Sequence, residues 1–357
     1  MALMFYLLDK DMEIKRIIET YKSAIWTERY YERGDFELYI PATVEIIADL
    51  NFDSSGSTQY IVRADDTTKC AMIESVKIST DADNGNFITV SGHTLDALAF
   101  RRVVTSQTTY TGSAAKIIER LITKSIVSPD AVNRAIANFS FKNSIEDSDR
   151  ALTAQYCGEN VGEAVEAISK TIHTGYRVNF DIDNKTMEFE IYEGADRSLY
   201  QQDNPPVIFS NDFNNLLTSN YTVSVENWRN NALVIGEGQG TNRVRVEFGE
   251  DNAGIERREV YVNEQESSTN GGEITKGAYM QVLYDRGYQA CAENRPLRET
   301  EADVAPNYGF KLGVDYFLGD IVSVENEYGV KITPRVVETI EAQDDNGYSI
   351  IPTFAID

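Results

Sequence analysis

The chain contains very few of the side chains that enzymes most often use for proton transfer and metal binding. Only two of its 357 residues are histidines and three are cysteines: His93, His173, Cys70, Cys157 and Cys291. Because these residues are far apart in the sequence, they form no zinc-binding spacing, and three scattered cysteines argue against a disulfide framework. The sequence predicts no metal site, no cofactor and reduced, mostly buried thiols. A metal site made only of carboxylates stays open.

Positive charge and long apolar runs are also scarce. The chain has 33 Lys and Arg against 57 Asp and Glu, a net charge of -24. A nucleic-acid interface requires clustered Lys and Arg, and the nearest candidates, Arg101-Arg102 and Arg257-Arg258, are interpreted as solvated surface. The acidic segment 299–303 is interpreted as a solubility feature. No run approaches the roughly 18 to 20 apolar residues that cross a bilayer, and residues 1–8 lack the basic flank of a secretion signal, so we expect cytoplasmic synthesis without a membrane segment.

Three short motifs suggest chemistry at first sight, and each has a better structural interpretation. Ser113 and Lys116 match the Ser-x-x-Lys of penicillin-recognising serine enzymes, but the companion segments are absent and Ser113 suits a helix N-cap. The glycine-rich segment 236–240 lacks the helix that a phosphate loop needs directly after it, and 81–85 lacks the ligand positions of a calcium loop. We predict hairpin turns at both, name no catalytic residue, and expect that the chain is not an enzyme.

Apolar and polar residues alternate along most of the chain, which is typical of half-buried strands. The predicted strands are 4–8, 22–33, 36–40, 59–63, 71–79, 86–91, 176–181, 187–192, 217–225, 231–237, 243–248 and the region from 307 to the end. Helical spacing predicts helices at 113–124, 161–171 and 278–295, whereas 44–50 is ambiguous. A composition of 42% hydrophobic and 25% charged residues over this length predicts a globular protein of two to four domains.

Two segments near opposite ends of the chain are its most informative parts. Residues 26–41 read WTERYYERGDFELYIP, and residues 313–324 read GVDYFLGDIVSV. Each combines aromatic and β-branched residues, which suit a half-buried strand, with a Gly-Asp pair, which suits a turn.

The first segment resembles the opening of phage tail hub proteins, which end the tail tube in siphoviruses and related contractile particles and carry the tail tip. The matching residues are Trp26, Arg29, Tyr30, Gly34, Phe36, Leu38, Ile40 and Pro41. The second segment is similar to the C-terminal strand pair of this family, through Tyr316, Leu318, Gly319, Asp320 and Val322. Between them, the segment VSGHTL at 90–95, which includes Gly92, resembles a strand end of the family, although His93 stands where Arg or Lys is more common.

The resemblance implies a β-dominated α+β fold. It implies two tail-tube-like β-barrel or sandwich domains with two α-containing inserted modules. The expected units are a first tube-like β domain at 1–105, a small α+β module at 106–202, a second tube-like β domain at 203–262 and 304–357, and a helical insertion at 263–303.

The same resemblance implies a structural virion component at the tail tip. Three copies would cap the tail tube, adapt its sixfold symmetry to the threefold tip and leave a channel for genome passage. The implied neighbours are the tail tube or distal tail protein above, and tip, spike or receptor-binding proteins below. The tape-measure protein and DNA would pass through the lumen without specific binding.

Several alternatives stay open at this stage. The aromatic residues of the first segment pack either between subunits or over their own core, because aromatic side chains favour both settings. The acidic charge serves either a DNA-repelling lumen or plain solubility. A receptor- or carbohydrate-binding tail-tip module and a tail-associated peptidase or cell-wall hydrolase are the competing functions.

Overall fold

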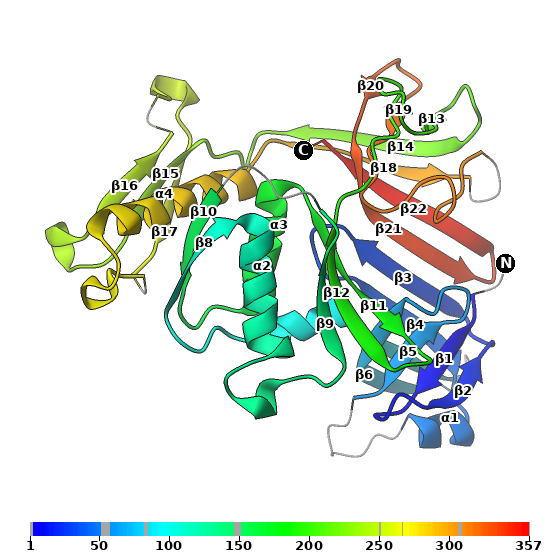
Figure 1. Ribbon diagram of the computed structural model, residues 1–357. Helices are drawn as coiled ribbons and strands as arrows, with labels where there is room; N and C mark the ends of the chain where they lie inside the picture. The colour runs from blue at the N-terminus through cyan, green and yellow to red at the C-terminus, as the bar shows by residue number, and fades with distance from the viewer. Residues whose placement is uncertain are drawn as a thin grey trace.

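The protein is built around one large sheet of eleven strands, shown in Figure 1. The computed structural model describes residues 3–50, 58–81, 85–145, 151–249, 251–265, 267–305 and 309–356. In chain order the strands of the large sheet are β1 (Phe5–Leu8), β2 (Ile14–Ile18), β3 (Ser23–Arg29), β4 (Asp35–Pro41), β5 (Tyr60–Arg63), β6 (Cys70–Asp81), β7 (Gly85–Thr94), β14 (Leu216–Ser224), β18 (Leu297–Val304), β21 (Arg335–Asp344) and β22 (Gly347–Ala355). Their spatial order is β14-β18-β22-β21-β3-β4-β7-β6-β5-β1-β2.

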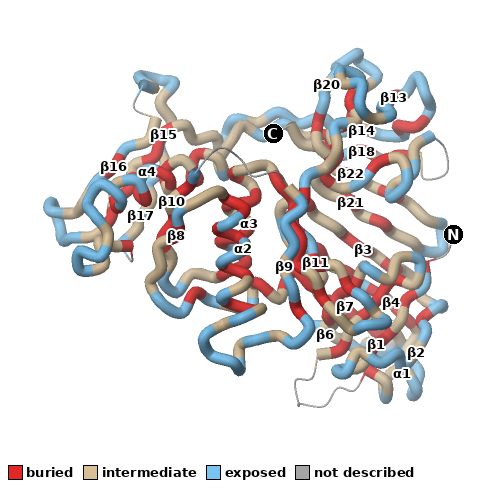
Figure 2. The backbone as a smooth tube through the Cα atoms, in the orientation of Figure 1, coloured by how far each residue is buried: buried red, intermediate tan, exposed pale blue. Residues whose placement is uncertain are grey.

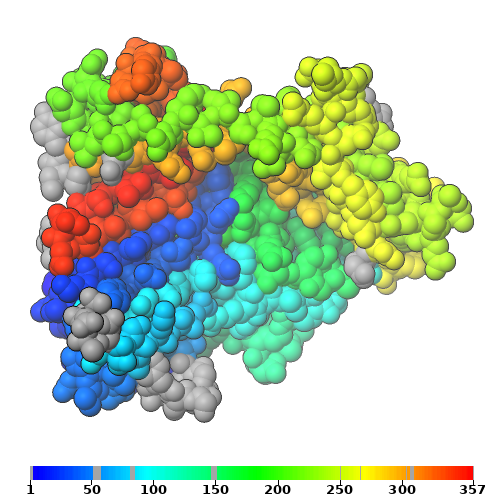
Figure 3. All heavy atoms as spheres, turned by 180° about the vertical axis from the view of Figure 1, so that it is seen from behind, coloured from blue at the N-terminus to red at the C-terminus, as the bar shows by residue number. Residues whose placement is uncertain are grey.

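Strands from the two ends of the chain share this sheet because β3 pairs antiparallel with β21, with Trp26 opposite Glu341. We call β1–β7 the N-terminal half and β14, β18, β21 and β22 the C-terminal half of the sheet. Figure 3 shows the blue N-terminal and red C-terminal strands side by side on the rear face. Strands β2 and β14 are the two edges of the sheet, and within the described residues they do not pair with each other, so the sheet is open and the expected barrel closure is absent.

The hairpin predicted around Gly34-Asp35 is confirmed by the antiparallel pairing of β3 with β4. In β4 the side chains of Phe36, Leu38 and Ile40 are buried while Glu37 points to solvent, as the period of two requires. The ambiguous segment after it is helix α1 (Val44–Asp49), because the Thr43 side chain accepts a hydrogen bond from the Ile46 backbone N–H.

An α+β module follows the N-terminal half, with helices packed beside two small sheets (Figure 1). Its elements are η1 (Leu95–Arg101), β8 (Thr108–Ser113), α2 (Ala114–Ile122), the π-helical turn η2 (Thr123–Val127), η3 (Val132–Arg134), β9 (Phe139–Asn143), β10 (Ala151–Tyr156), α3 (Val161–Ile172), β11 (Gly175–Asp181) and β12 (Thr186–Tyr192). Helix α2 begins directly after Ser113 as predicted, although the Ser113 side chain makes no capping hydrogen bond. Helix α3 ends at His173, whose φ of 58° is left-handed.

A second excursion forms a lobe that projects from the sheet (Figure 1). It contains β15 (Asn231–Ile235), η4 (Gly240–Asn242), β16 (Arg245–Phe248), η5 (Gly254–Glu256), β17 (Glu259–Asn263), η6 (Asn270–Gly272) and α4 (Lys276–Glu293). The glycine-rich segment 236–240 connects antiparallel β15 and β16, which confirms the predicted hairpin. Another small sheet combines β13 (Ile208–Ser210), β19 (Ser323–Glu325) and β20 (Lys331–Ile332).

The acidic segment 299–303, predicted as part of the helical insertion, instead belongs to strand β18. This strand pairs with β14 on one side and β22 on the other. Thr300, Ala302 and Val304 are buried on one face, and the glutamates alternate with them. The strand was not predicted because several of its inward-facing residues are small or polar, so apolar and polar residues do not alternate clearly in the sequence.

Four clusters of buried apolar residues stabilise these parts, and Figure 2 shows the buried segments in red. One cluster lies within the N-terminal half, one within the C-terminal half, one in the lobe, and the largest in the α+β module. The β-dominated α+β class expected from the sequence is therefore confirmed.

Candidate functional site at the junction of the sheet and the α+β module

Tyr30 lies where the two sheet halves meet the α+β module. Its backbone N–H donates to the Val337 carbonyl oxygen over 2.8 Å, and its hydroxyl lies 3.2 Å from both the His173 and Tyr192 carbonyl oxygens. Burial raises the pKa of Tyr30 to about 12. The ring also fits closely against two glycines, because a Cβ at Gly175 or Gly319 would overlap it.

The Gly319-Asp320 pair completes this junction from the C-terminal side. Gly319 has a φ of +94°, and its carbonyl oxygen accepts a 2.7 Å hydrogen bond from Arg335. The buried Asp320 carboxylate accepts hydrogen bonds from the Ala195 N–H (2.7 Å), the Arg197 Nε–H (2.7 Å) and the Phe317 N–H (2.9 Å). The two segments singled out in the sequence therefore meet in space.

The other aromatic candidates lie inside the chain. Trp26 and Phe36 are buried in the core of the N-terminal half, with ring centroids 6.0 Å apart. Tyr316 is buried in the C-terminal half, where its ring lies 5.2 Å from that of Phe209. The sequence left open whether the aromatic residues of the first segment pack between subunits or over their own core, and in the single chain Trp26 and Phe36 lie in that core.

The polar and glycine candidates hold the edge of the first hairpin. Arg29 bridges two strands, because its Nε–H donates to Glu338 (2.6 Å) and its Nη1–H to Asp35 (2.6 Å). Gly34 donates its N–H to the Thr94 hydroxyl (3.0 Å). Gly92 lies in β7, where a Cβ would overlap the Met72 carbonyl of the neighbouring strand β6. Pro41 ends β4 and pairs with Phe87 of β7.

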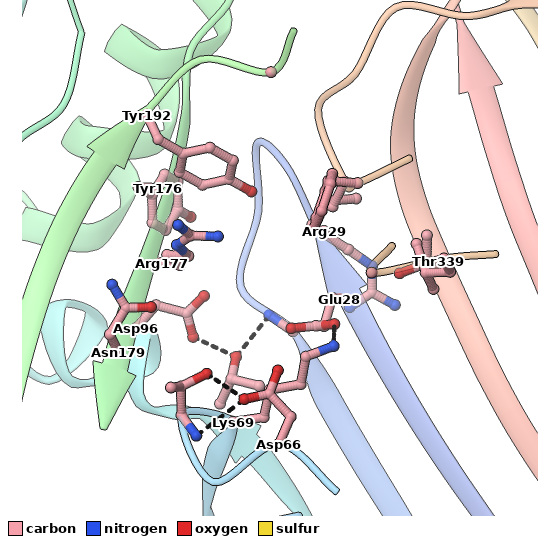
Figure 4. A pocket seen from close by; sticks show the side chains of 18 of the residues that line it. Glu28, Arg29, Asp66, Lys69, Asp96, Tyr176, Arg177, Asn179, Tyr192 and Thr339 are labelled. Carbon is pink, nitrogen blue, oxygen red and sulfur yellow. Dashed lines mark hydrogen bonds and ion pairs between the residues drawn. The ribbon is translucent and has the colours of Figure 1, made fainter. Parts of the chain in front are cut away.

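A pocket of about 470 Å³ opens at this junction. In Figure 4 Tyr176, Arg177 and Tyr192 form the wall on the module side, and Glu28 and Arg29 face them from β3. The lining charges are of both signs and largely paired: Lys69 contacts Glu28, Arg177 contacts Glu190, and Arg197 contacts Asp320. Such ion pairs hold the walls of the pocket in position and leave little net charge facing its interior.

Asp96 is a buried carboxyl at the base of this pocket that the sequence pattern did not indicate. The Thr94 hydroxyl, which accepts from Gly34, donates to Asp96 Oδ1, and the Ala97 N–H donates to the same oxygen over 3.0 Å. Burial raises the pKa of Asp96 to about 6, even though these hydrogen bonds favour the ionised form. Asp96 lies in η1, and only its tertiary packing reveals it.

A second unpredicted contact joins the two sheet halves through a buried ion pair. Arg63 of β5 donates to both carboxylate oxygens of Glu341 in β21, at 3.0 Å for Nη2, and pairs with Asp65 at 2.7 Å. Burial works to raise the pKa of Glu341, but Arg63 outweighs it and the pKa is lowered. Residues 278 positions apart are therefore fixed to each other.

Both histidines lie beside charged side chains, and two of the three cysteines are buried. His93 pairs with Glu74, and Arg295 lies 2.9 Å from the His173 ring. Cys70 and Cys291 are buried as predicted, whereas Cys157 is exposed, and the three thiols are free. Over the residues that the structure describes, no group of three or more His, Cys, Asp or Glu side chains could hold a metal ion. No described helix is both long and apolar enough to span a bilayer.

The fold is that of phage tail proteins. A tail protein from Neisseria meningitidis MC58 superposes with a TM-score of 0.60 at 12% identity, covering 100% of this chain and 97% of the other. The 43 kDa tail protein of prophage MuSo2 from Shewanella oneidensis gives 0.55 at 13% identity, covering 98% of each chain. Prophage tail protein gp18 from Listeria monocytogenes EGD-e gives 0.53 at 10% identity, covering 100% and 95%.

The chain belongs to the Siphovirus ReqiPepy6 Gp37-like protein family, whose family model matches residues 4–354. No curated protein sequence matches the chain. The family confirms the resemblance noted in the sequence and makes the chain a structural component of a phage tail.

Proposed function

We propose that three copies of this chain form the hub at the tip of a phage tail. The hub caps the tail tube, adapts sixfold to threefold symmetry and keeps a channel open for the genome. Its neighbours are the tail tube or distal tail protein on one side and tip, spike or receptor-binding proteins on the other. The role is structural, without catalysis.

The observation that carries this proposal is the open large sheet with two apolar edges. Strand β2 exposes Ile14 and Ile17, and β14 exposes Leu217 and Val223, each side chain being between 52% and 59% exposed. An edge strand with unpaired backbone groups and exposed apolar side chains is a template for pairing with another chain. If β14 of one copy pairs with β2 of the next, the contact is head-to-tail and closes a ring when the rotation is threefold.

Symmetry adaptation follows from the two sheet halves of each chain. Three chains contribute six halves around one axis, which matches a sixfold tube to a threefold tip. We propose the two tube-like units with the bounds expected from the sequence: residues 1–105 form the first, and residues 203–262 with 304–357 form the second. Strand β18 is added to the second unit because it lies in the C-terminal half of the sheet.

The channel proposal rests on charge. Three chains carry a net charge of about -72, three times -24. An acidic lumen repels the phosphates of DNA, so the genome and the tape-measure protein pass without specific binding. Plain solubility is the competing explanation for the acidic composition. Phage carrying lysine in place of lumen carboxylates should eject more slowly, and unchanged ejection rates would favour solubility.

The edge pairing is tested by placing a charge in each edge strand. We expect the purified protein to sediment at three times the monomer mass, and Ile17→Lys or Val223→Lys to give monomers. Ile255→Lys is the matched control, because Ile255 is 92% exposed and lies in the lobe, away from both edges. Phage with either edge variant should also lack complete tails. Normal tails from both edge variants would refute the edge pairing, and cell-wall clearing by the purified protein would refute the non-catalytic role.

A further inference from the structure

A second pocket, of about 590 Å³, lies in the α+β module and has a charge unlike the rest of the chain. Arg120 of α2, Lys124 of η2 and Arg134 of η3 line it, together with a single acidic residue, Asp130. Three cations and one anion converge there in a chain whose net charge is -24. We call these three basic residues the cationic cluster.

The positive charges of the cationic cluster are poorly neutralised within the part of the chain that the structure describes. Arg120 donates to the Thr111 carbonyl oxygen over 3.4 Å, and Arg134 donates to the Val103 carbonyl oxygen over 2.7 Å. Neither guanidinium contacts a described carboxylate. Lys124 pairs with Asp130 at 3.6 Å, and the Asp130 side chain is 96% exposed, so this contact is weak.

Arg102 adds a fourth positive charge behind the cluster. Its Nη2–H donates to the Arg134 carbonyl oxygen over 3.2 Å, while its buried Nε–H has no partner among the described residues. Burial lowers the pKa of Arg102, and the nearby charges of Arg134 and Arg101 lower it further. Arg101 is paired with Glu74, whereas Arg102 and Arg134 repel each other and neither guanidinium contacts a described carboxylate.

The pocket also offers a hydroxyl donor. Ser125 in η2 is only 4% exposed and lines the cavity. A hydroxyl in the wall of a cavity can donate a hydrogen bond to an acceptor oxygen of a bound ligand.

The preference of helix ends for basic residues is the simplest competing explanation. Arg120 and Lys124 lie in the last turns of their helices, where cations complement the helix dipole. Arg134 also ends its helix, η3, but that preference does not explain why it lines the same cavity as residues from another segment. Convergence of side chains from separate elements on one cavity is what a binding site requires.

We propose that this pocket binds a small phosphate-bearing anion. Guanidinium and ammonium donors with a hydroxyl match the several acceptor oxygens of a phosphate group. A long nucleic acid fits poorly, because three cations neutralise few phosphates and a polyanion would extend over the acidic remainder of the surface. A small anion stays within the roughly 8 Å over which charges act at physiological salt. The inference does not depend on the proposed hub function.

Calorimetric titration of the full chain with inorganic phosphate and with diphosphate at low salt tests the proposal. We expect diphosphate to bind more tightly than phosphate and both affinities to fall with added sodium chloride. The double variant Arg120→Gln, Lys124→Gln should weaken diphosphate binding about tenfold or more, since each removed residue donates charge-assisted hydrogen bonds. Both positions are exposed, so circular dichroism should show an unchanged fold.

Two matched variants make the test specific. Lys77→Gln removes an exposed charge on β6, and it should leave the affinity unchanged within about twofold. Asp130→Asn removes the single competing carboxylate and should raise the affinity up to about fivefold. No binding of diphosphate to the unaltered chain, equal binding by the double variant, or tighter binding of a short DNA duplex would each overturn the proposal.

Discussion

Replacing Gly319 by alanine should destabilise the protein by straining the backbone and by displacing the Tyr30 ring. Gly319 has a φ of +94°, where an L-residue costs about 1–2 kcal/mol. A Cβ there would also overlap the buried Tyr30 ring, which hydrogen bonds and packing hold in place. Overpacking of this kind costs about 1–3 kcal/mol. The free energy of unfolding should therefore fall by about 2–5 kcal/mol in total.

Urea unfolding followed by tryptophan fluorescence measures this loss, because Trp26 lies in the adjacent core. Gly313→Ala is the matched control: its φ is +78°, yet a Cβ there meets nothing within 4 Å. It should lose only the backbone part, about 1–2 kcal/mol. In a double-mutant cycle, Tyr30→Ala should reduce the cost of Gly319→Ala to that of the control. Equal losses for Gly319→Ala and Gly313→Ala, with no coupling to Tyr30, would refute the reasoning.

Two further predictions concern buried carboxyl groups. The pKa of Asp96 is about 6 in the folded state, above its ordinary value of 3.8, so the folded state holds the proton more tightly than the unfolded state. The free energy of unfolding should therefore fall by about 3 kcal/mol as the pH rises from about 4 to 6. Asp96→Asn should flatten this part of the stability curve measured by urea unfolding, and an unaltered slope would contradict it. Glu341→Gln removes the buried one of the two carboxylates that pair with Arg63, leaving only Asp65, and should cost about 3 kcal/mol. The exposed Glu37→Gln should change stability by less than about 0.5 kcal/mol, and similar losses for the two variants would disprove the role of the ion pair.

The sequence indicated the local structure well wherever residue spacing alone decides it. The β3–β4 hairpin, the helices after Ser113 and Asn160, and the strand-flanked glycine segment 236–240 all formed as predicted. These elements depend on the period of apolar residues and on turn or cap residues, which are local properties. Strand β18 was missed because its inward side chains are small or polar, and partners far along the chain fix its place in the sheet.

The sequence by itself determined the β-dominated class, the hairpin and turn positions and the resemblance to phage tail proteins, since each rests on neighbouring residues. Only the tertiary structure decided that both ends of the chain share one open sheet, because strand pairing over hundreds of residues leaves no local signal. The same holds for the junction of Tyr30 with Gly319 and for the buried carboxyl of Asp96. Burial and charge there depend on which distant segments come together, and folding alone settles that.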